Sequence, residues 1–185
     1  MVSATKTEPS DEELMAAYID GDHEAFRQLF LRYGPILLRL TMRHLRNEEL
    51  AREVVQQTFF QVHAARFDFR RDKKLRPWIF TIAMNLVREH YRRAKRRKET
   101  VLDEARAEAA PQGRMPIEVR ERADLLHQAL RTLPDSQREV VELHWFKELP
   151  FAEVAMIVGA SEGAVRVRAH RAYRKLRDLL QAELR

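Results

Sequence analysis

Residues 151–172 read FAEVAMIVGASEGAVRVRAHRA, and this stretch decides how the C-terminal half folds. It contains two short helical patterns separated by the three residues Gly159, Ala160 and Ser161. Gly159 can adopt the left-handed conformation that ends a helix. Ser161 can accept a hydrogen bond from an amide in the first turn of the next helix. The stretch therefore predicts a helix-turn-helix.

The helix predicted after Ser161 has an apolar face and a basic face. Helical spacing directs these residues toward the core: Val165, Ala169, Ala172, Leu176 and Leu180. The opposite side carries Arg166, Val167, His170, Arg171 and Arg174. An arginine in the major groove of DNA can bind guanine O6 and N7 or a phosphate, and Val167 can touch a thymine methyl. The residue types on this face are suited to binding DNA. A structural helical hairpin with a solvated arginine face fits the same spacing.

Helical patterns extend over most of the chain. Apolar residues recur at three- and four-residue spacing, and only five glycines occur, so the sequence predicts an all-α fold. The expected helical segments are residues 11–45 with a break near Gly21, 47–65, 74–98, 118–132, 136–147, 151–158 and 162–183. Ser136 to Glu139 match a capping box that would begin one of them.

A segment of different composition separates the two helical halves. Over residues 99–118 acids outnumber bases, and Pro111, Gly113 and Pro116 prevent a continuous helix. We therefore expect two small helical domains, residues 10–98 and 118–183, joined by a flexible linker over residues 99–117.

The segment 74–98 has a continuous apolar stripe, to which Trp78 belongs. Its opposite face aligns Thr81, Asn85, Arg88, Arg92 and Arg96. This ridge can follow a DNA backbone, although charged faces are often merely solvated. Phe67 and Phe69 lie in the polar segment just before it, a position suited to stacking an exposed base, while burial is the more common fate of an aromatic ring.

The composition of the chain indicates what kind of partner it binds and excludes some kinds of protein. Lys and Arg total 34 against 28 acids, and the net charge of +6 favours nucleic acid over acidic membrane or acidic protein. The absence of cysteine excludes disulfides, cysteine-ligated zinc and thiol redox chemistry. No apolar run approaches the roughly 18 to 20 residues of a membrane span, and residues 1–10 lack a signal-peptide core. We expect a cytoplasmic protein without direct membrane insertion.

Catalytic motifs are missing from the sequence. We find no phosphate-binding glycine loop, paired-carboxylate site or nucleophile motif, and the seven histidines lack the spacing of a helical zinc site. We interpret His44, His63 and His127 as satisfied or partly buried side chains. We therefore expect that the chain is not an enzyme and that it binds neither a metal nor a cofactor.

Several segments together resemble extracytoplasmic-function (ECF) sigma factors of the sigma-70 family. They are residues 50–59 (LAREVVQQTF), 76–85 (RPWIFTIAMN) with the basic tail that follows, and 133–139 (LPDSQRE). The helix-turn-helix is similar to region 4 of that family over residues 149–161 and 164–172. The resemblance implies a region 2 domain that binds the polymerase clamp and opens the −10 element, and a region 4 domain that binds the −35 element. Core RNA polymerase would perform the catalysis.

The resemblance assigns roles to individual residues. It implies a β′-clamp contact through Glu53, Val54, Gln56, Gln57 and Phe60, with region 4 binding the β flap. It implies a −10 pocket formed by Phe69 and Asn85, with backbone contacts by Arg88 and Arg92. Arg166 and Arg171 match basic −35 contacts of the family, and the recognition-helix set is completed by Ser161, Val167, His170 and Arg174.

Two departures from the family pattern and two rival functions remain. The family usually carries an acid where Gln57 stands, and Val167 and His170 occupy positions that vary with promoter preference, so no −35 sequence is transferred. The resemblance also implies an anti-sigma partner. A stand-alone helix-turn-helix regulator would instead need a dimerisation surface, and an RNA-binding or scaffolding module would bind with steep salt dependence.

Overall fold

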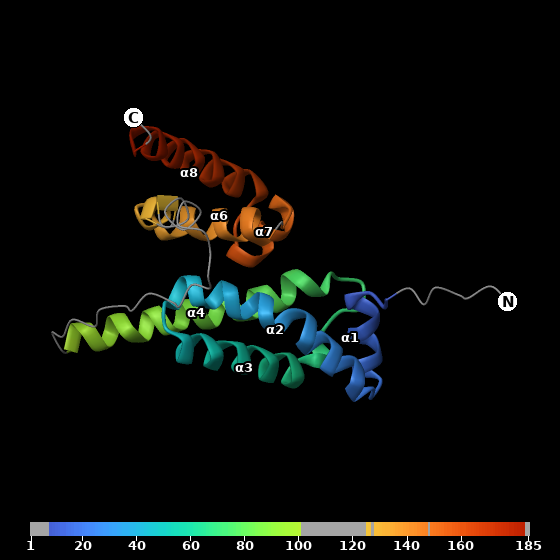
Figure 1. The fold of residues 1–185 in the computed structure, drawn as a ribbon. Helices are drawn as coiled ribbons and strands as arrows, with labels where there is room; N and C mark the ends of the chain where they lie inside the picture. Colours follow the sequence, from blue (N-terminus) through green and yellow to red (C-terminus); the bar gives the residue numbers. More distant parts are fainter. Residues whose placement is uncertain (1–7, 101–124, 127, 148, 184–185) are drawn as a thin grey trace, which may run out of the picture. The chain divides into compact units, whose positions relative to one another are not determined.

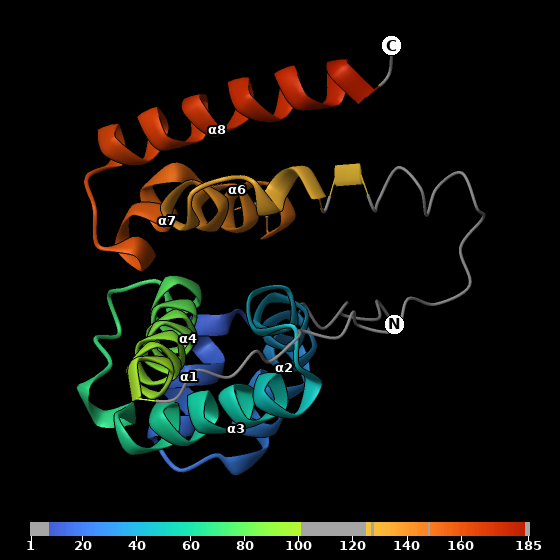
Figure 2. The same ribbon diagram turned by 90° about the vertical axis from the view of Figure 1, so that its left-hand side faces the viewer.

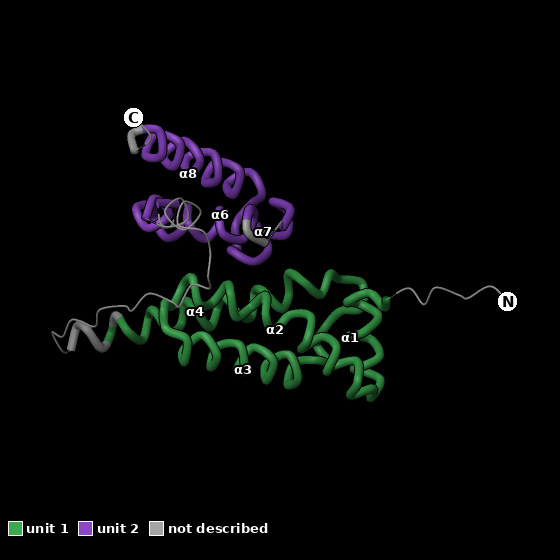
Figure 3. The backbone as a smooth tube through the Cα atoms, viewed as in Figure 1, with its two compact units in different colours: residues 1–110 green, residues 111–185 purple. Residues whose placement is uncertain are grey.

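The described part of the chain is entirely helical. The computed structural model describes residues 8–100, 125–126, 128–147 and 149–183, and no strand occurs among them. The chain divides into two compact units, which are residues 1–110 and residues 111–185, as Figure 3 shows. The expected all-α fold is therefore confirmed.

Over its described residues, 8–100, the first unit is a bundle of four α-helices (Figures 1 and 2). Its elements are α1 (Asp11–Ile19), α2 (His23–Leu45), α3 (Glu48–Ala64), the short 3-10 helix η1 (Arg66–Asp68) and α4 (Leu75–Thr100). Helix α2 packs against α1, α3 and α4, and α4 also packs against α3. Figure 1 shows the C-terminal end of α4 projecting beyond α2 and α3.

Large apolar side chains fill the centre of this bundle. Fully buried positions include Leu29, Tyr33, Leu37 and Leu40 on α2, Leu75, Ile79, Phe80 and Met84 on α4, and Met15 on α1. On α4 the buried and half-buried positions follow the predicted apolar stripe, and Trp78 is half-buried. Such a core supplies most of the folding free energy, because each large apolar side chain that is removed from water stabilises the bundle by about 1.5 to 3 kcal/mol.

Side-chain caps set where the helices of the first unit begin. Asp22 and Asn47 accept hydrogen bonds from amides in the first turns of α2 and α3. Gly21, at φ 107°, makes the break predicted between the first two helices. Glu12 on α1 accepts a hydrogen bond from the amide of Leu75 at 3.1 Å, so a residue distant in sequence caps the start of α4.

The second unit contains α6 (Asp135–Lys147), α7 (Phe151–Val158) and α8 (Glu162–Glu183). Each of these three helices packs against the other two. Its core includes Ala129, Leu130, Leu133, Val141, Ala172 and Leu176. Because α8 contributes two of these residues, its orientation is fixed along one face.

The turn between α7 and α8 has the predicted geometry. Gly159 has a φ of 65°, in the left-handed region that ends α7. The Ser161 hydroxyl accepts a hydrogen bond from the amide of Ala164 at 3.2 Å, which caps the first turn of α8. The predicted helix-turn-helix is therefore confirmed.

Some sequence-based expectations differ from the structure or lie outside it. Helix α6 begins at Asp135, so Ser136 lies inside the first turn and the predicted capping box is wrong. The amides of Gln137 and Arg138 bond to the Pro134 carbonyl, which places the cap one residue earlier than Asp135. Most of the proposed linker, residues 99–117, lies outside the described residues, although α4 includes Glu99 and Thr100. The domain boundaries stay predictions.

Candidate DNA and polymerase interfaces

Helix α8 presents the two faces that the sequence predicted. Val165, Ala169, Ala172 and Leu176 are buried, and Leu180 is half-buried. All six predicted recognition residues are exposed: Ser161, Arg166, Val167, His170, Arg171 and Arg174. The exposed set is cationic, with one apolar side chain, Val167, at its centre. This combination can contact phosphates, guanine edges and thymine methyl groups.

Arg166 has defined neighbours near the start of α8. Its Nε and Nη2 atoms donate to Oε1 of Glu162 at 3.0 and 2.6 Å. Its guanidinium carbon lies 5.0 Å from the centroid of the Phe151 ring, within the range of a cation–π interaction. The side chain is therefore directed by an acid on its own helix and by an aromatic ring on α7.

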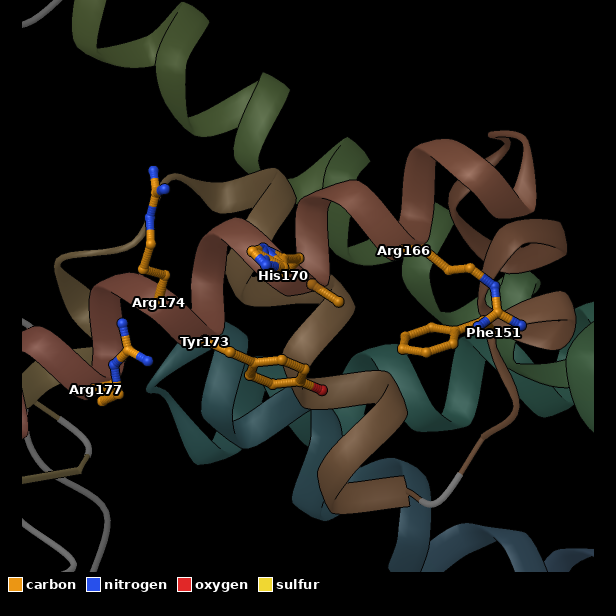
Figure 4. A pocket seen from close by; sticks show the side chains of 7 residues that line it. Phe151, Arg166, His170, Tyr173, Arg174 and Arg177 are labelled. Carbon is orange, nitrogen blue, oxygen red and sulfur yellow. The ribbon is translucent and has the colours of Figure 1, made fainter.

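A groove runs along the same side of α8, with a volume of about 590 Å³. Figure 4 shows the side chains that line it, which are Phe151, Arg166, Ala169, His170, Tyr173, Arg174 and Arg177. Burial raises the pKa of the Tyr173 hydroxyl above its ordinary value of 10.0, because it disfavours the charged form. The groove thus combines cations with rings and suits an anionic partner.

On α4 the predicted ridge lies partly at the surface. Asn85, Arg92 and Arg96 are exposed, and Arg88 is half-buried. Nη1 of Arg88 donates to Oδ1 of Asn85 at 2.7 Å, so these two polar groups act as one unit. The ridge can bind a phosphate backbone because its cations recur along one helix face.

The aromatic residues before α4 are arranged differently from the expectation. Phe69 is only 7% exposed, and its ring centroid lies 5.1 Å from that of Trp78. This ring packs into the bundle, which is the alternative that the sequence left open, and its role in the −10 pocket stays a prediction. Phe67 is 68% exposed, and Arg66 lies over its ring at 4.2 Å. Phe67 is the accessible ring of this segment.

The proposed polymerase-binding residues of α3 also differ in their burial. Glu53, Gln56 and Gln57 are exposed, and Phe60 is 62% exposed. Val54 is only 8% exposed and packs against the bundle, and its proposed polymerase contact stays a prediction. Residues at i, i+3 and i+4 share one helix face, which explains why Glu53, Gln56, Gln57 and Phe60 form a continuous surface.

Two of the three histidines interpreted from the sequence as satisfied or partly buried are described by the structure. His44 is buried, and His63 hydrogen-bonds through Nδ1 to the Tyr18 hydroxyl, while His127 lies outside the described residues. In the described ranges no group of three or more possible ligand residues could hold a metal ion. Those ranges also contain no helix long and apolar enough to cross a membrane.

Sequence reasoning missed the groove residues Phe151, Tyr173 and Arg177. Tyr173 and Arg177 follow Arg166 and His170 at helical spacing, so the pattern of exposed positions could have found them. Phe151 begins another helix, and its position beside Arg166 depends on the turn between α7 and α8. No spacing along the chain predicts that contact.

A helix-turn-helix with a cationic outer face, and a separate helical unit with a basic ridge, define a two-domain helical DNA-binding protein. Residues 29–97 match the family model described as Sigma-70 region 2, and residues 123–176 match that of Sigma-70, region 4. The chain belongs to the ECF RNA polymerase sigma factors.

Individual relatives extend over nearly the whole chain. RNA polymerase sigma factor CarQ of Myxococcus xanthus is 35% identical over 172 residues, which cover 90% of this chain and 95% of that protein. ECF RNA polymerase sigma factor SigM of Mycobacterium tuberculosis is 32% identical over 173 residues, which cover 94% of this chain and 86% of that protein.

Two solved structures are similar in fold. CnrH in complex with the cytosolic domain of CnrY matches with a TM-score of 0.72 and 29% identity, covering 93% of this chain and 97% of that one. The sigma factor RpoE in complex with the anti-sigma factor NepR from Bartonella quintana matches with a TM-score of 0.65 and 26% identity. The match covers 84% of this chain and 96% of that one.

Proposed function

We propose that this chain binds core RNA polymerase and directs it to specific promoters as an ECF sigma factor. One observation carries the proposal: a capped helix-turn-helix with five exposed candidate contact residues on α8 occurs in a chain whose other unit matches sigma-70 region 2. A sigma factor needs both parts, because the two promoter elements are contacted separately. The chain would be a transcription initiation factor and no enzyme itself.

The −35 element is assigned to α8. Ser161, Arg166, Val167, His170, Arg171 and Arg174 are accessible, and the major groove is wide enough to admit an α-helix. Arginines can read guanine edges there, while Val167 can contact a thymine methyl. Positions 167 and 170 vary with promoter preference in the family pattern, so we expect Val167 and His170 to contribute to the choice of −35 sequence.

The −10 element is assigned to the segment before α4 and to its polar ridge. Asn85, Arg88 and Arg92 would hold the non-template strand, as the family resemblance implies. Opening the duplex requires a base to leave its stack, which costs a few kcal/mol. The exposed ring of Phe67 can offset part of this cost by stacking, whereas Phe69 supports the segment from within the core.

Core RNA polymerase is the proposed protein partner. The exposed face of α3, with Glu53, Gln56, Gln57 and Phe60, is assigned to the β′ clamp, and the second unit to the β flap. Gln57 removes one negative charge from a surface that would face basic groups, so we expect this contact to depend less on salt than it would with an acid there.

An anti-sigma factor is the second proposed protein partner. The similar structures of CnrH and RpoE were solved with CnrY and with the anti-sigma factor NepR, respectively. A bound inhibitor would prevent the chain from joining polymerase, and so from using its two DNA-binding surfaces, until a signal arrives. Because polymerase is its site of action, the chain would act in the cytoplasm.

The test is co-elution with purified core RNA polymerase, followed by footprinting on genomic fragments. We expect a stable complex and protection of DNA at two elements only when polymerase is present. A stand-alone regulator would instead protect two half-sites without polymerase. Binding that lacks sequence preference and falls steeply with salt would indicate a general nucleic-acid-binding module.

A further inference from the structure

The guanidinium group of Arg166 is held from two directions at the start of α8. Nε and Nη2 donate to Glu162 Oε1, and the Phe151 ring centroid lies 5.0 Å from the guanidinium carbon. Exposed Arg171, on the same helix, has neither a ring contact nor an ion pair among the described residues. Arg166 thus has more restraining contacts than Arg171, which lies five residues further along the helix.

Phe151 is itself fixed by α6. Its ring stacks on that of His144, with centroids 3.9 Å apart and planes 24° apart. Nδ1 of His144 donates to the carbonyl of Leu149 at 2.7 Å, and the Leu149 side chain is fully buried. The ring beside Arg166 is therefore anchored to α6 through the half-buried side chain of His144.

A restrained arginine is better suited to reading a base than a mobile one. Bidentate binding to guanine requires the planar guanidinium to present two N–H groups in one orientation. An unrestrained arginine loses much rotamer freedom on binding, whereas a side chain already held in place loses less. A stacked ring restrains the plane of the guanidinium without using any of its N–H donors.

We propose that Phe151 is a positioning residue for base recognition by Arg166. Its ring, together with Glu162, presents the guanidinium to the −35 element in one orientation. The inference rests on the proposed function, since it requires α8 to read DNA. Phe151 acts through Arg166 and needs no contact with a base.

The test uses the full chain bound to core RNA polymerase and a set of promoter duplexes, each with one base pair of the −35 element changed. Affinity is measured for wild type, Phe151→Leu, Phe151→Tyr, Arg166→Ala and the double variant Phe151→Leu/Arg166→Ala. Arg166→Ala identifies the base pair that Arg166 reads, where discrimination should fall by roughly five- to 150-fold.

Phe151→Leu keeps an apolar side chain but removes the ring. We expect discrimination at that same base pair to fall by about two- to fivefold, since this is the contribution of a cation–π contact at an exposed site. Phe151→Tyr should retain discrimination because it keeps the ring. In the Arg166→Ala background, Phe151→Leu should cause no further loss.

Several results would overturn the proposal. They are unchanged discrimination in Phe151→Leu, a loss that persists in the Arg166→Ala background, or an equal loss in Phe151→Tyr. Arg166→Ala that weakens all sequences equally would make Arg166 a phosphate contact and would also overturn it. If Phe151→Leu does not fold, side-chain ¹⁵Nε order parameters of the wild type decide: Arg166 should exceed Arg171, and equal values would contradict the proposal.

The wild-type protein separates this inference from the proposed function. Absence of specific promoter binding by the wild-type complex would end both. Specific binding that depends on Arg166 but not on the ring at position 151 would end only the positioning role.

Discussion

Phe67 and Phe69 are two positions apart and lie in opposite environments. Phe67 is 68% exposed with Arg66 over its ring, whereas Phe69 is 7% exposed and packs against Trp78. Accessible aromatic faces stack on unpaired bases, while buried ones stabilise a core. We therefore expect changes at these two positions to affect promoter opening and folding stability separately.

We predict that Phe67→Ala impairs promoter opening and changes the free energy of unfolding by no more than about 0.5 kcal/mol. The matched change Phe69→Ala should cost about 3 to 5 kcal/mol of stability because it leaves a cavity beside Trp78. Permanganate reactivity of unpaired thymines measures opening, and urea unfolding measures stability. Normal opening in Phe67→Ala would exclude the stacking role.

Arg171 is an exposed cation near the middle of the α8 face. Arg171→Ala should lower affinity by about 1 to 3 kcal/mol at one −35 base pair if this residue reads a base edge. Binding to single-base variants of the promoter measures the effect. Arg131→Ala removes the same charge from an exposed position outside α8 and serves as control. Equal weakening on every sequence would make Arg171 a phosphate contact.

At the residue scale, the sequence predicts a helix face well and individual burial less well. The exposed arginines of α8 follow from helical spacing alone, because a long helix has only one buried side here. Val54 and Phe69 belong to segments with predicted binding roles but are buried, since the environment of each side chain depends on which neighbours pack over it. The contact of Phe151 with Arg166 depends on a turn, so spacing does not reveal it.

Helix α1 begins with a complete capping box. The amide and hydroxyl of Ser10 donate to Oε2 of Glu13 at 2.7 and 2.8 Å, and the Glu13 amide donates back to the Ser10 hydroxyl at 3.2 Å. The backbone bond first, and then the hydroxyl bond, hold the pKa of Glu13 below its ordinary value of 4.5. The carboxylate form of Glu13 therefore stabilises the first turn of α1.

We predict that this stabilisation is present above pH 4.5 and is lost as the pH falls through the lowered pKa of folded Glu13. Amide hydrogen exchange in the first turn of α1 measures it, with Glu13→Gln compared at each pH. The variant should exchange faster than wild type at neutral pH, and the difference should shrink in acid. A difference that is constant with pH would contradict the prediction.

At the element scale, spacing located the described α-helices to within a residue or two, because each buries one apolar stripe, whereas the 3-10 helix η1 was not predicted. The start of α6 was misplaced because Ser136 offered a capping pattern, while the Pro134 carbonyl accepts the first bonds. Similarly, the cap that Glu12 supplies to Leu75 joins two helices far apart in sequence. Local patterns do not contain that information.

At the scale of the molecule, each of the two units has its own buried core. Leu37 is fully buried in the first unit and Leu143 in the second. We predict that Leu37→Ala and Leu143→Ala each cost about 2 to 5 kcal/mol, and that each shifts a different thermal transition. Scanning calorimetry measures both transitions. A single transition that both changes lower equally would show that the units unfold together.

The division into two units fits the division of labour in promoter recognition. One unit carries the α4 ridge and the exposed face of α3, and the other carries the α8 reader. Neither surface alone distinguishes a sigma factor from another DNA-binding protein, since helix-turn-helix units occur in many regulators. Joint action with polymerase is therefore the central claim.

Run-off transcription with purified core RNA polymerase tests that claim most directly. The templates are a promoter selected by the complex, derivatives with the −10 or the −35 element scrambled, and one whose spacer is lengthened by about half a helical turn, roughly five base pairs. We predict a transcript from the intact promoter and a strong loss from all three derivatives. Polymerase binding without any promoter-dependent transcript, or transcription that is insensitive to the spacer, would contradict the account.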